Sequence, residues 1–152
     1  MQFWDMPGLP SLRSRRIPYY RGADCCVLVY DVTSLESFES LDGWRNEFLA
    51  EISIRDEHYY PFVVIGNKID LDNRTVDQER PRLWIRDTNV MPYSYFETSA
   101  KYSINVKKAF QKIVNNALNY NKQKILDDIE VLNEHKSQLR CCSPFSCMHS
   151  IF

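Results

Sequence analysis

The stretch Pro61-Phe62-Val63-Val64-Ile65-Gly66-Asn67-Lys68-Ile69-Asp70 decides how the rest of this chain is interpreted. Its first half is continuously apolar and rich in β-branched residues, which is typical of a strand buried on both faces of a parallel sheet. Gly66 then allows the chain to turn, and polar side chains follow at once. Because ligands of open α/β sheets bind just beyond the carboxyl ends of the strands, we predict a binding loop over residues 66–70.

The polar groups of this loop suit one class of ligand. The carboxylate of Asp70 can accept two parallel hydrogen bonds from adjacent N–H donors, which guanine presents at N1 and at its exocyclic amine. Adenine has no such pair of donors, so a carboxylate at this position would discriminate between the two bases. We expect Asn67 and Lys68 to brace the loop, with the lysine stem covering one face of the ring.

Two motifs together resemble a known family. Asn67-Lys68-Ile69-Asp70 is similar to the guanine-specificity loop of Ras-like GTPases, and Glu97-Thr98-Ser99-Ala100-Lys101 looks like the second base-contacting loop of that family. The resemblance implies that the first loop binds the base, and that the amide of Ala100 reaches the guanine oxygen with Ser99 and Lys101 beside it. The alternative is an unrelated parallel α/β domain with ordinary polar loops.

Further segments narrow the resemblance to the Rab family, in its late-endosomal branch. They are Tyr19-Tyr20-Arg21-Gly22-Ala23-Asp24, Cys25-Cys26-Val27-Leu28-Val29 with the following Tyr30-Asp31-Val32-Thr33, and Trp44-Arg45-Asn46-Glu47-Phe48. The resemblance runs from about Phe3 to Leu118. It implies binding of GTP or GDP with Mg²⁺, a role in endosomal or lysosomal vesicle traffic, and Rab effectors and escort or exchange proteins as partners. The rival interpretation is a GTPase remnant that binds no nucleotide and acts as a protein-interaction module.

The beginning of the chain keeps part of a third family motif. Asp5-Met6-Pro7-Gly8 has the family's Asp-x-x-Gly spacing, which implies that Asp5 holds Mg²⁺ through water and that the Gly8 amide meets the terminal phosphate. Leu9 stands where the family has the glutamine that orients the attacking water, so we expect impaired hydrolysis and leave open whether the chain is an enzyme. From the residues alone, a simple turn explains the same segment.

The phosphate-binding loop of the family has no counterpart in these residues. The chain has only 4 glycines and no Gly-x-x-x-x-Gly-Lys-[Ser/Thr] motif. The resemblance places that loop, together with two strands and a helix, ahead of residue 1. We therefore expect an incomplete Ras-like G domain that comes from a truncated gene product, a splice form or an incomplete gene model.

The predicted fold is α/β, with a mostly parallel sheet flanked by helices and a long C-terminal helix and tail. We expect strands at residues 25–30, 61–65 and 93–96, and helices after Thr33, within 73–87 and from Val106 past Leu118 towards Leu132. The spacing from Thr33 to Glu36 is that of a capping box, and Pro81 should delay or kink its helix. We expect a solvated loop over residues 11–18. By resemblance a strand ends at Trp4.

We divide the chain into a truncated G domain at 1–118 and a C-terminal extension at 119–152. Rab proteins end in one or two cysteines that carry lipid chains, and Cys141-Cys142 resembles such a pair, which would attach the chain to a membrane. Ten residues follow the pair here. Another interpretation of the extension is a helical tether in which residues 125–139 pack on a second chain.

Composition excludes several classes of function. The 19 basic and 20 acidic residues are nearly balanced, so nucleic acid is not an expected partner. No apolar run approaches the length needed to cross a membrane. The 5 cysteines show no Cys-x-x-Cys spacing, and we expect a reduced, cytoplasmic protein acting at the cytoplasmic face of late endosomes or lysosomes.

Overall fold

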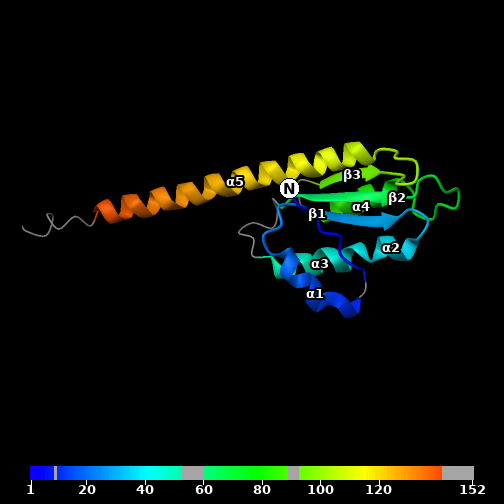
Figure 1. Cartoon of the computed structure of the whole chain (residues 1–152), viewed down its shortest axis with the longest axis horizontal. Coiled ribbons are helices and arrows are strands. Elements are labelled where there is room, and N and C mark those ends of the chain that lie inside the picture. The colour runs from blue at the N-terminus through cyan, green and yellow to red at the C-terminus, as the bar shows by residue number, and fades with distance from the viewer. Residues whose placement is uncertain (9, 53–59, 89–92, 142–152) are drawn as a thin grey trace, which may run out of the picture. The chain divides into compact units, whose positions relative to one another are not determined.

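A computed structural model describes residues 1–8, 10–52, 60–88 and 93–141. Within these ranges the elements are η1 (Pro10–Leu12), α1 (Arg13–Tyr20), β1 (Cys26–Asp31), α2 (Leu35–Glu39), α3 (Leu41–Glu51), β2 (Phe62–Asn67), α4 (Glu79–Asp87), β3 (Tyr93–Glu97) and α5 (Val106–Cys141), as Figure 1 shows. The chain divides into two compact units, Met1–Tyr120 and Asn121–Phe152.

The described strands form one parallel sheet in the order β1-β2-β3. Cys26 lies opposite Phe62 and Asp31 opposite Asn67, while Phe62 lies opposite Tyr93 on the other side of β2. All three strands therefore end at the same edge of the sheet. The arrangement confirms the predicted α/β class, and the central position of β2 explains its continuous apolar sequence.

The two faces of β2 belong to two separate clusters of buried side chains. Phe62 and Val64 pack with side chains of β1, α2 and α3, among them Phe38 and Phe48. Val63 and Ile65 pack instead with Ala109 and Ile113 of α5. Side chains thus alternate between the two faces, and Figure 1 shows α5 on one face of the sheet with α2 and α3 on the other.

The expected solvated loop over residues 11–18 is wrong, because this segment forms η1 and most of α1. The physical reason lies in α3. The guanidinium of Arg16 is buried, donates to the Glu47 carboxylate at 3.0 and 3.1 Å, and lies 4.7 Å from the centre of the Trp44 ring. This long-range pairing holds an arginine-rich segment in a helix.

The helix expected after Thr33 begins one residue later than the capping box predicts. The Ser34 side chain is the N-cap and accepts from the Ser37 amide, while Thr33 donates to Asp31. The helical segment also divides at Ser40 into α2 and α3. The prediction for α4 is confirmed, since the helix begins at Glu79 and Pro81 occupies its first turn.

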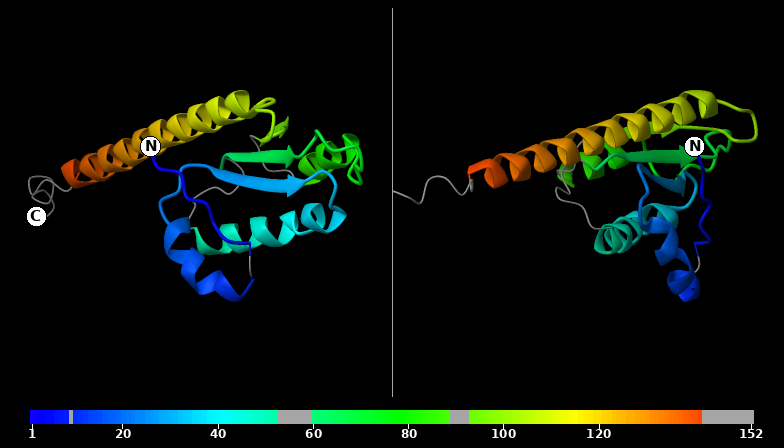
Figure 2. Two further views of the ribbon diagram at one scale, coloured as in Figure 1. Left: turned by 45° about the vertical axis from the view of Figure 1, so that its right-hand side comes forward. Right: turned by 60° about the vertical axis from the view of Figure 1, so that its left-hand side comes forward.

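The strand that the resemblance places up to Trp4 does not form. Residues 1–8 have no regular secondary structure. Phe3 contacts the Phe110 ring of α5 with ring centres 5.4 Å apart, and Trp4 contacts Tyr19 of α1 at 4.6 Å. Figure 2 shows the segment passing from the α5 side of the sheet to the side of α1 and α3. Side-chain packing with these helices takes the place of strand pairing.

The extension of α5 beyond Leu118 is confirmed, and the helix reaches Cys141. Cys142 lies outside the described residues, as does Leu9. Among the described residues, no helix has the length and apolar content needed to cross a membrane.

Candidate functional site

The polar residues predicted to bind a ligand meet at the carboxyl ends of β2 and β3. A pocket of about 310 Å³ lies between the two loops and is lined by Asn67, Lys68, Asp70, Leu71, Ala100 and Lys101. Five of these six residues are those that the two motifs predicted. The structure therefore brings both motifs to one site, as expected for loops that follow adjacent parallel strands.

Asn67 links the two loops. Its side-chain oxygen accepts hydrogen bonds from the Thr98 hydroxyl at 3.2 Å and from the Ala100 amide at 3.0 Å. The backbone adds two links, from the Thr98 amide to the Gly66 carbonyl at 2.8 Å and from the Ile69 amide to the Thr98 carbonyl at 3.2 Å. The amide that the resemblance assigned to the guanine oxygen therefore donates to Asn67 in this structure.

The Asp70 carboxylate is held from behind by Ser99. The buried Ser99 hydroxyl donates to Oδ1 of Asp70 at 2.6 Å and accepts from the Tyr102 amide at 3.1 Å. A carboxylate has about four acceptor positions, so this bond leaves both oxygens able to accept from a ligand. The arrangement fixes the direction of the carboxylate before a ligand arrives.

Lys68 joins the pocket to the end of β1. Its backbone has a φ of 67°, in the left-handed region that non-glycine residues seldom adopt, and its Nζ lies 2.6 Å from Oδ2 of Asp31. Burial alone raises the pKa of Asp31, but hydrogen bonds from Lys68 and Thr33 outweigh burial and hold that pKa below its ordinary value. Asp31 was not predicted from the sequence. The feature that could have indicated it is a carboxylate at the end of the strand that neighbours β2.

Glu97 fixes the start of the second loop. Its carboxylate accepts from Arg74 at 2.7 Å, from Tyr95 at 2.9 Å and from Gln78 at 3.0 Å. Its carbonyl accepts from the Asn105 side chain at 2.9 Å. Burial raises the pKa of Glu97, but the hydrogen bonds from Arg74 and Tyr95 lower it by more. The pKa is therefore below its ordinary value, and the carboxyl group stays ionised to a lower pH than a free glutamate. The loop from 98 to 105 is thus held at both ends.

Asp5 and Gly8 do not line this pocket within the described part of the chain. Gly8 lies beside Trp44, which is 4.0 Å from the position of a Cβ at residue 8, and the Pro7 carbonyl accepts from Arg16 at 3.1 Å. No group of three or more His, Cys, Asp or Glu side chains among the described residues is placed to hold a metal ion.

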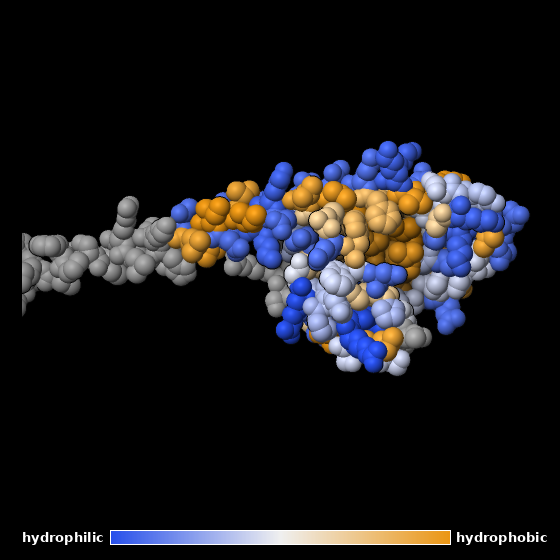
Figure 3. Space-filling view, viewed as in Figure 1, coloured by the Kyte–Doolittle hydropathy of each residue, from blue (hydrophilic) through white to orange (hydrophobic). Residues whose placement is uncertain are grey.

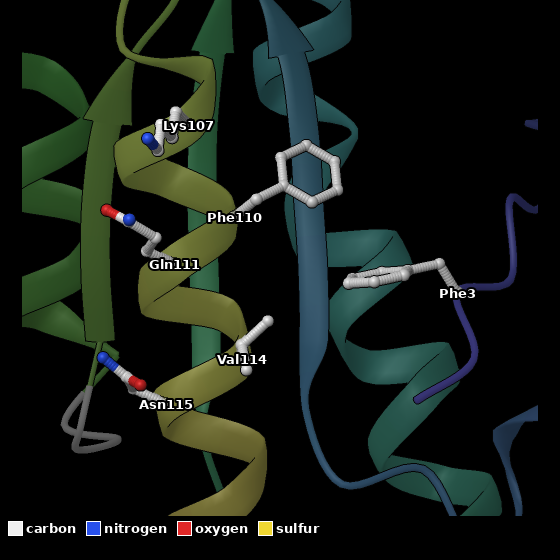
Figure 4. A pocket seen from close by; sticks show the side chains of 6 residues that line it. All are labelled: Phe3, Lys107, Phe110, Gln111, Val114 and Asn115. Atoms are coloured by element: carbon white, nitrogen blue, oxygen red, sulfur yellow. The ribbon is translucent and has the colours of Figure 1, made fainter.

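A larger and more open pocket of about 510 Å³ lies between α5 and the N-terminal segment, lined by Phe3, Lys107, Phe110, Gln111, Val114 and Asn115. Figure 4 shows Phe3 and Phe110 side by side at one end of it, and Figure 3 shows apolar side chains gathered on this face. It contains none of the residues that the motifs single out. Its lining offers no carboxylate or constrained polar loop, so the smaller pocket is the better candidate for specific binding.

Comparison with known proteins agrees with the geometry. Residues 1–119 match the Ras family. The chain belongs to the Ras family. It is 50% identical over 139 residues to Ras-related protein Rab7 of Drosophila melanogaster, which covers 91% of this chain and 64% of the relative. It is 52% identical over 119 residues to Ras-related protein Rab-7a of Dictyostelium discoideum, which covers 78% and 58%.

The chain covers a larger share of a relative from a plant. Ras-related protein Rab7 of Pisum sativum is 45% identical over 148 residues, which covers 93% of this chain and 71% of the relative. These similarities to Rab7 proteins confirm the predicted membership of the Rab family and of its late-endosomal branch. The chain spans only about three-fifths of the length of the Drosophila and Dictyostelium relatives, at 64% and 58%.

Proposed function

We propose that this chain binds a guanine nucleotide by its base in the pocket between the loops after β2 and β3. The observation that carries the proposal is the Asp70 carboxylate, which lines the pocket and is oriented by the Ser99 hydroxyl at 2.6 Å. Its oxygens accept from N1–H and from the exocyclic amine of guanine. Asn67, Ala100 and Lys101 complete the walls that surround the ring.

The preference for guanine follows because adenine would leave the Asp70 carboxylate without hydrogen-bond donors. Adenine has an acceptor at N1 and no amine at C2, so the Asp70 carboxylate would face a lone pair. A buried acceptor left without a donor costs about 1 to 3 kcal/mol, which corresponds to roughly a 5- to 150-fold loss of affinity. The pocket should therefore prefer guanine by roughly 5- to 150-fold.

The wider role that we propose is that of a Rab small GTPase in endosomal vesicle traffic, working at the cytoplasmic face of late endosomes or lysosomes. The similarity to three Rab7 proteins supports it. In this role GTP or GDP with Mg²⁺ occupies the site, Asp5 and Gly8 serve the metal and the phosphate, and Rab effectors and escort or exchange proteins are the partners. Cys141 and Cys142 are the proposed lipid attachment points.

We propose that hydrolysis is weak. Leu9 stands where the family has its water-orienting glutamine, and its side chain has no hydrogen-bonding group with which to orient a water molecule. The rival role is an interaction module that binds no nucleotide. The exposed rings of Trp4 and Tyr19, whose centres lie 4.6 Å apart, favour it, since they offer an aromatic contact surface at the start of residues 19–22.

A titration separates the two roles. Guanosine, GDP, adenosine and ATP are added to ¹⁵N-labelled protein, and amide chemical shifts are followed. Guanosine and GDP should shift the amides of residues 67–71 and 99–102, with adenosine and ATP binding roughly 5- to 150-fold more weakly. Equal binding of guanosine and adenosine, or no shift at millimolar guanosine, would overturn nucleotide binding and favour the interaction module.

A further inference from the structure

We propose that Asp31 is a positioning residue for the base pocket, because it anchors Lys68 so that the lysine stem forms a fixed wall of the site. The inference rests on the proposed function and deepens it. Neither binding motif contains Asp31, which ends a different strand from the two that carry the loops.

The geometry around Asp31 is that of an anchor. Its Oδ1 accepts from the Thr33 amide at 2.8 Å and from the Thr33 hydroxyl at 2.7 Å, which leaves Oδ2 directed at Lys68 at 2.6 Å. The Asp31 amide donates to the Ser37 hydroxyl at 3.0 Å, so the backbone is held as well. Both oxygens of the carboxylate are therefore committed, and its rotation would break at least two bonds.

Without such an anchor, the Lys68 side chain would be free to change rotamer. Its side chain is 54% exposed, and it lines the pocket from a backbone in the left-handed region. A lysine at this exposure samples many rotamers, and each is lost when a ring packs against the stem. The pairing with Asp31 selects one rotamer in advance, so less entropy is lost when the base binds.

The pairing also reaches from the pocket to the helix that follows β1. Ser37 of α2 donates through its hydroxyl to the carbonyl of Asp31 at 3.2 Å and accepts from its amide. These two bonds hold the backbone of Asp31, so they keep its carboxylate in place beside Lys68.

Asp31→Asn is the most informative variant. The asparagine oxygen still accepts from Thr33, but an NH₂ group replaces Oδ2 and offers Lys68 no acceptor. Guanosine affinity, measured by amide shifts, should fall roughly three- to tenfold, as expected for releasing one long side chain. Glu39→Gln is the matched control: it removes the same charge and breaks the exposed pair with Arg80, but Glu39 does not line the pocket. Its guanosine affinity should equal that of the wild type.

A double-mutant cycle tests whether Asp31 acts through Lys68. In a Lys68→Met background, Asp31→Asn should change the dissociation constant for guanosine by less than about twofold. An effect that persists at full size in that background would show that Asp31 acts by another route. Wild-type affinity in Asp31→Asn would overturn the inference while leaving guanine binding intact.

A measurement on the nucleotide-free protein separates failure of this inference from failure of the proposed nucleotide binding. The carboxyl pKa of Asp31, followed by NMR in the nucleotide-free protein, should rise when Lys68→Met removes the ammonium group. A pKa that does not move would show that the ion pair is absent in solution and would overturn the inference. Failure of the wild type to bind guanosine would instead overturn the proposed function, and this inference with it.

Discussion

The hydroxyl oxygen of Tyr30 lies 2.6 Å from the point that a Cβ on Gly66 would occupy, and the ring carbon that bears it lies at 2.8 Å. Tyr30 is buried on β1, and its hydroxyl shares a hydrogen bond of 2.9 Å with that of Tyr95 on β3. The aromatic side chain thus passes over β2 where β2 has no side chain of its own. Gly66 is the last residue but one of β2, directly before the loop that we propose binds the base, so this contact fixes the position of the backbone from which the loop begins.

Gly66→Ala should therefore destabilise the fold. The methyl group would overlap a buried ring that is held by hydrogen bonding, and overpacking of this kind costs about 1 to 3 kcal/mol of unfolding free energy. Urea unfolding followed by circular dichroism measures the change. Gly43→Ala is the control, since nothing lies within 4 Å of a Cβ there and the residue is inside α3, so stability should rise by about 0.5 to 1 kcal/mol. A Gly66→Ala protein as stable as the wild type would contradict the close contact.

Arg16→Ala should lower the free energy of unfolding much more than the same substitution at the neighbouring Arg15. The Arg16 substitution removes the buried ion-pair partner of Glu47, which keeps its contacts with Tyr20 and Arg13. It also removes the donor to the Pro7 carbonyl. The Arg16 side chain is only 1% exposed, so the expected cost is about 3 kcal/mol, the lower end for breaking a buried pair. Arg15→Ala, one position earlier on the exposed side of α1, should change stability by less than about 0.5 kcal/mol. Equal effects in urea unfolding would show that α1 does not pack on α3 as described.

These two sites show how far sequence patterns reach. The strand at Phe62 and the loop after Gly66 were predicted because their signal is local: β-branched residues, then a glycine, then polar groups. The helix α1 was missed because the burial of Arg16 depends on side chains of α3, where its partner Glu47 is 31 positions away. A pattern analysis that takes arginine as exposed has no means of detecting such a pairing.

The same distinction applies to the candidate site. The two short motifs contain the side chains that would bind the base, so the sequence predicted Asn67, Asp70 and Ser99. Asp31 and the support of Glu97 by Arg74 were not predicted, because they depend on which strands are neighbours and on the path of the loop after Asp70. The register that places Asp31 opposite Asn67 becomes visible only in the folded sheet.

Acid should loosen the loop that follows β3. Glu97 has a lower pKa in the folded chain than its ordinary value near 4.5, so its contribution to stability is fully present above that value and is lost as pH falls through the folded pKa. Glu97→Gln should destabilise the wild type at pH 7 by about 2 to 4 kcal/mol, because Arg74 loses its charged partner.

The comparison of unfolding free energy at pH 7 and pH 3.5 measures this contribution. The wild type should lose more stability between the two values than Glu97→Gln does. Glu79→Gln is the control, since its pair with Arg82 is exposed and worth little. A Glu97→Gln protein with the same acid-dependent loss as the wild type would show that other carboxylates account for the loss.

The most direct test of guanine binding is a change of base preference at Asp70. In Asp70→Asn the side-chain oxygen still accepts from N1–H, but the NH₂ group now faces the C2 position and suits a carbonyl there, which xanthine has in place of the guanine amine. Guanosine and xanthosine are titrated into the wild type and into Asp70→Asn, with amide shifts of residues 67–71 as the readout. We predict that the wild type prefers guanosine by about tenfold or more and that Asp70→Asn prefers xanthosine. A variant that keeps the wild-type order of the two nucleosides would contradict base recognition by Asp70 and, with it, the proposed nucleotide site.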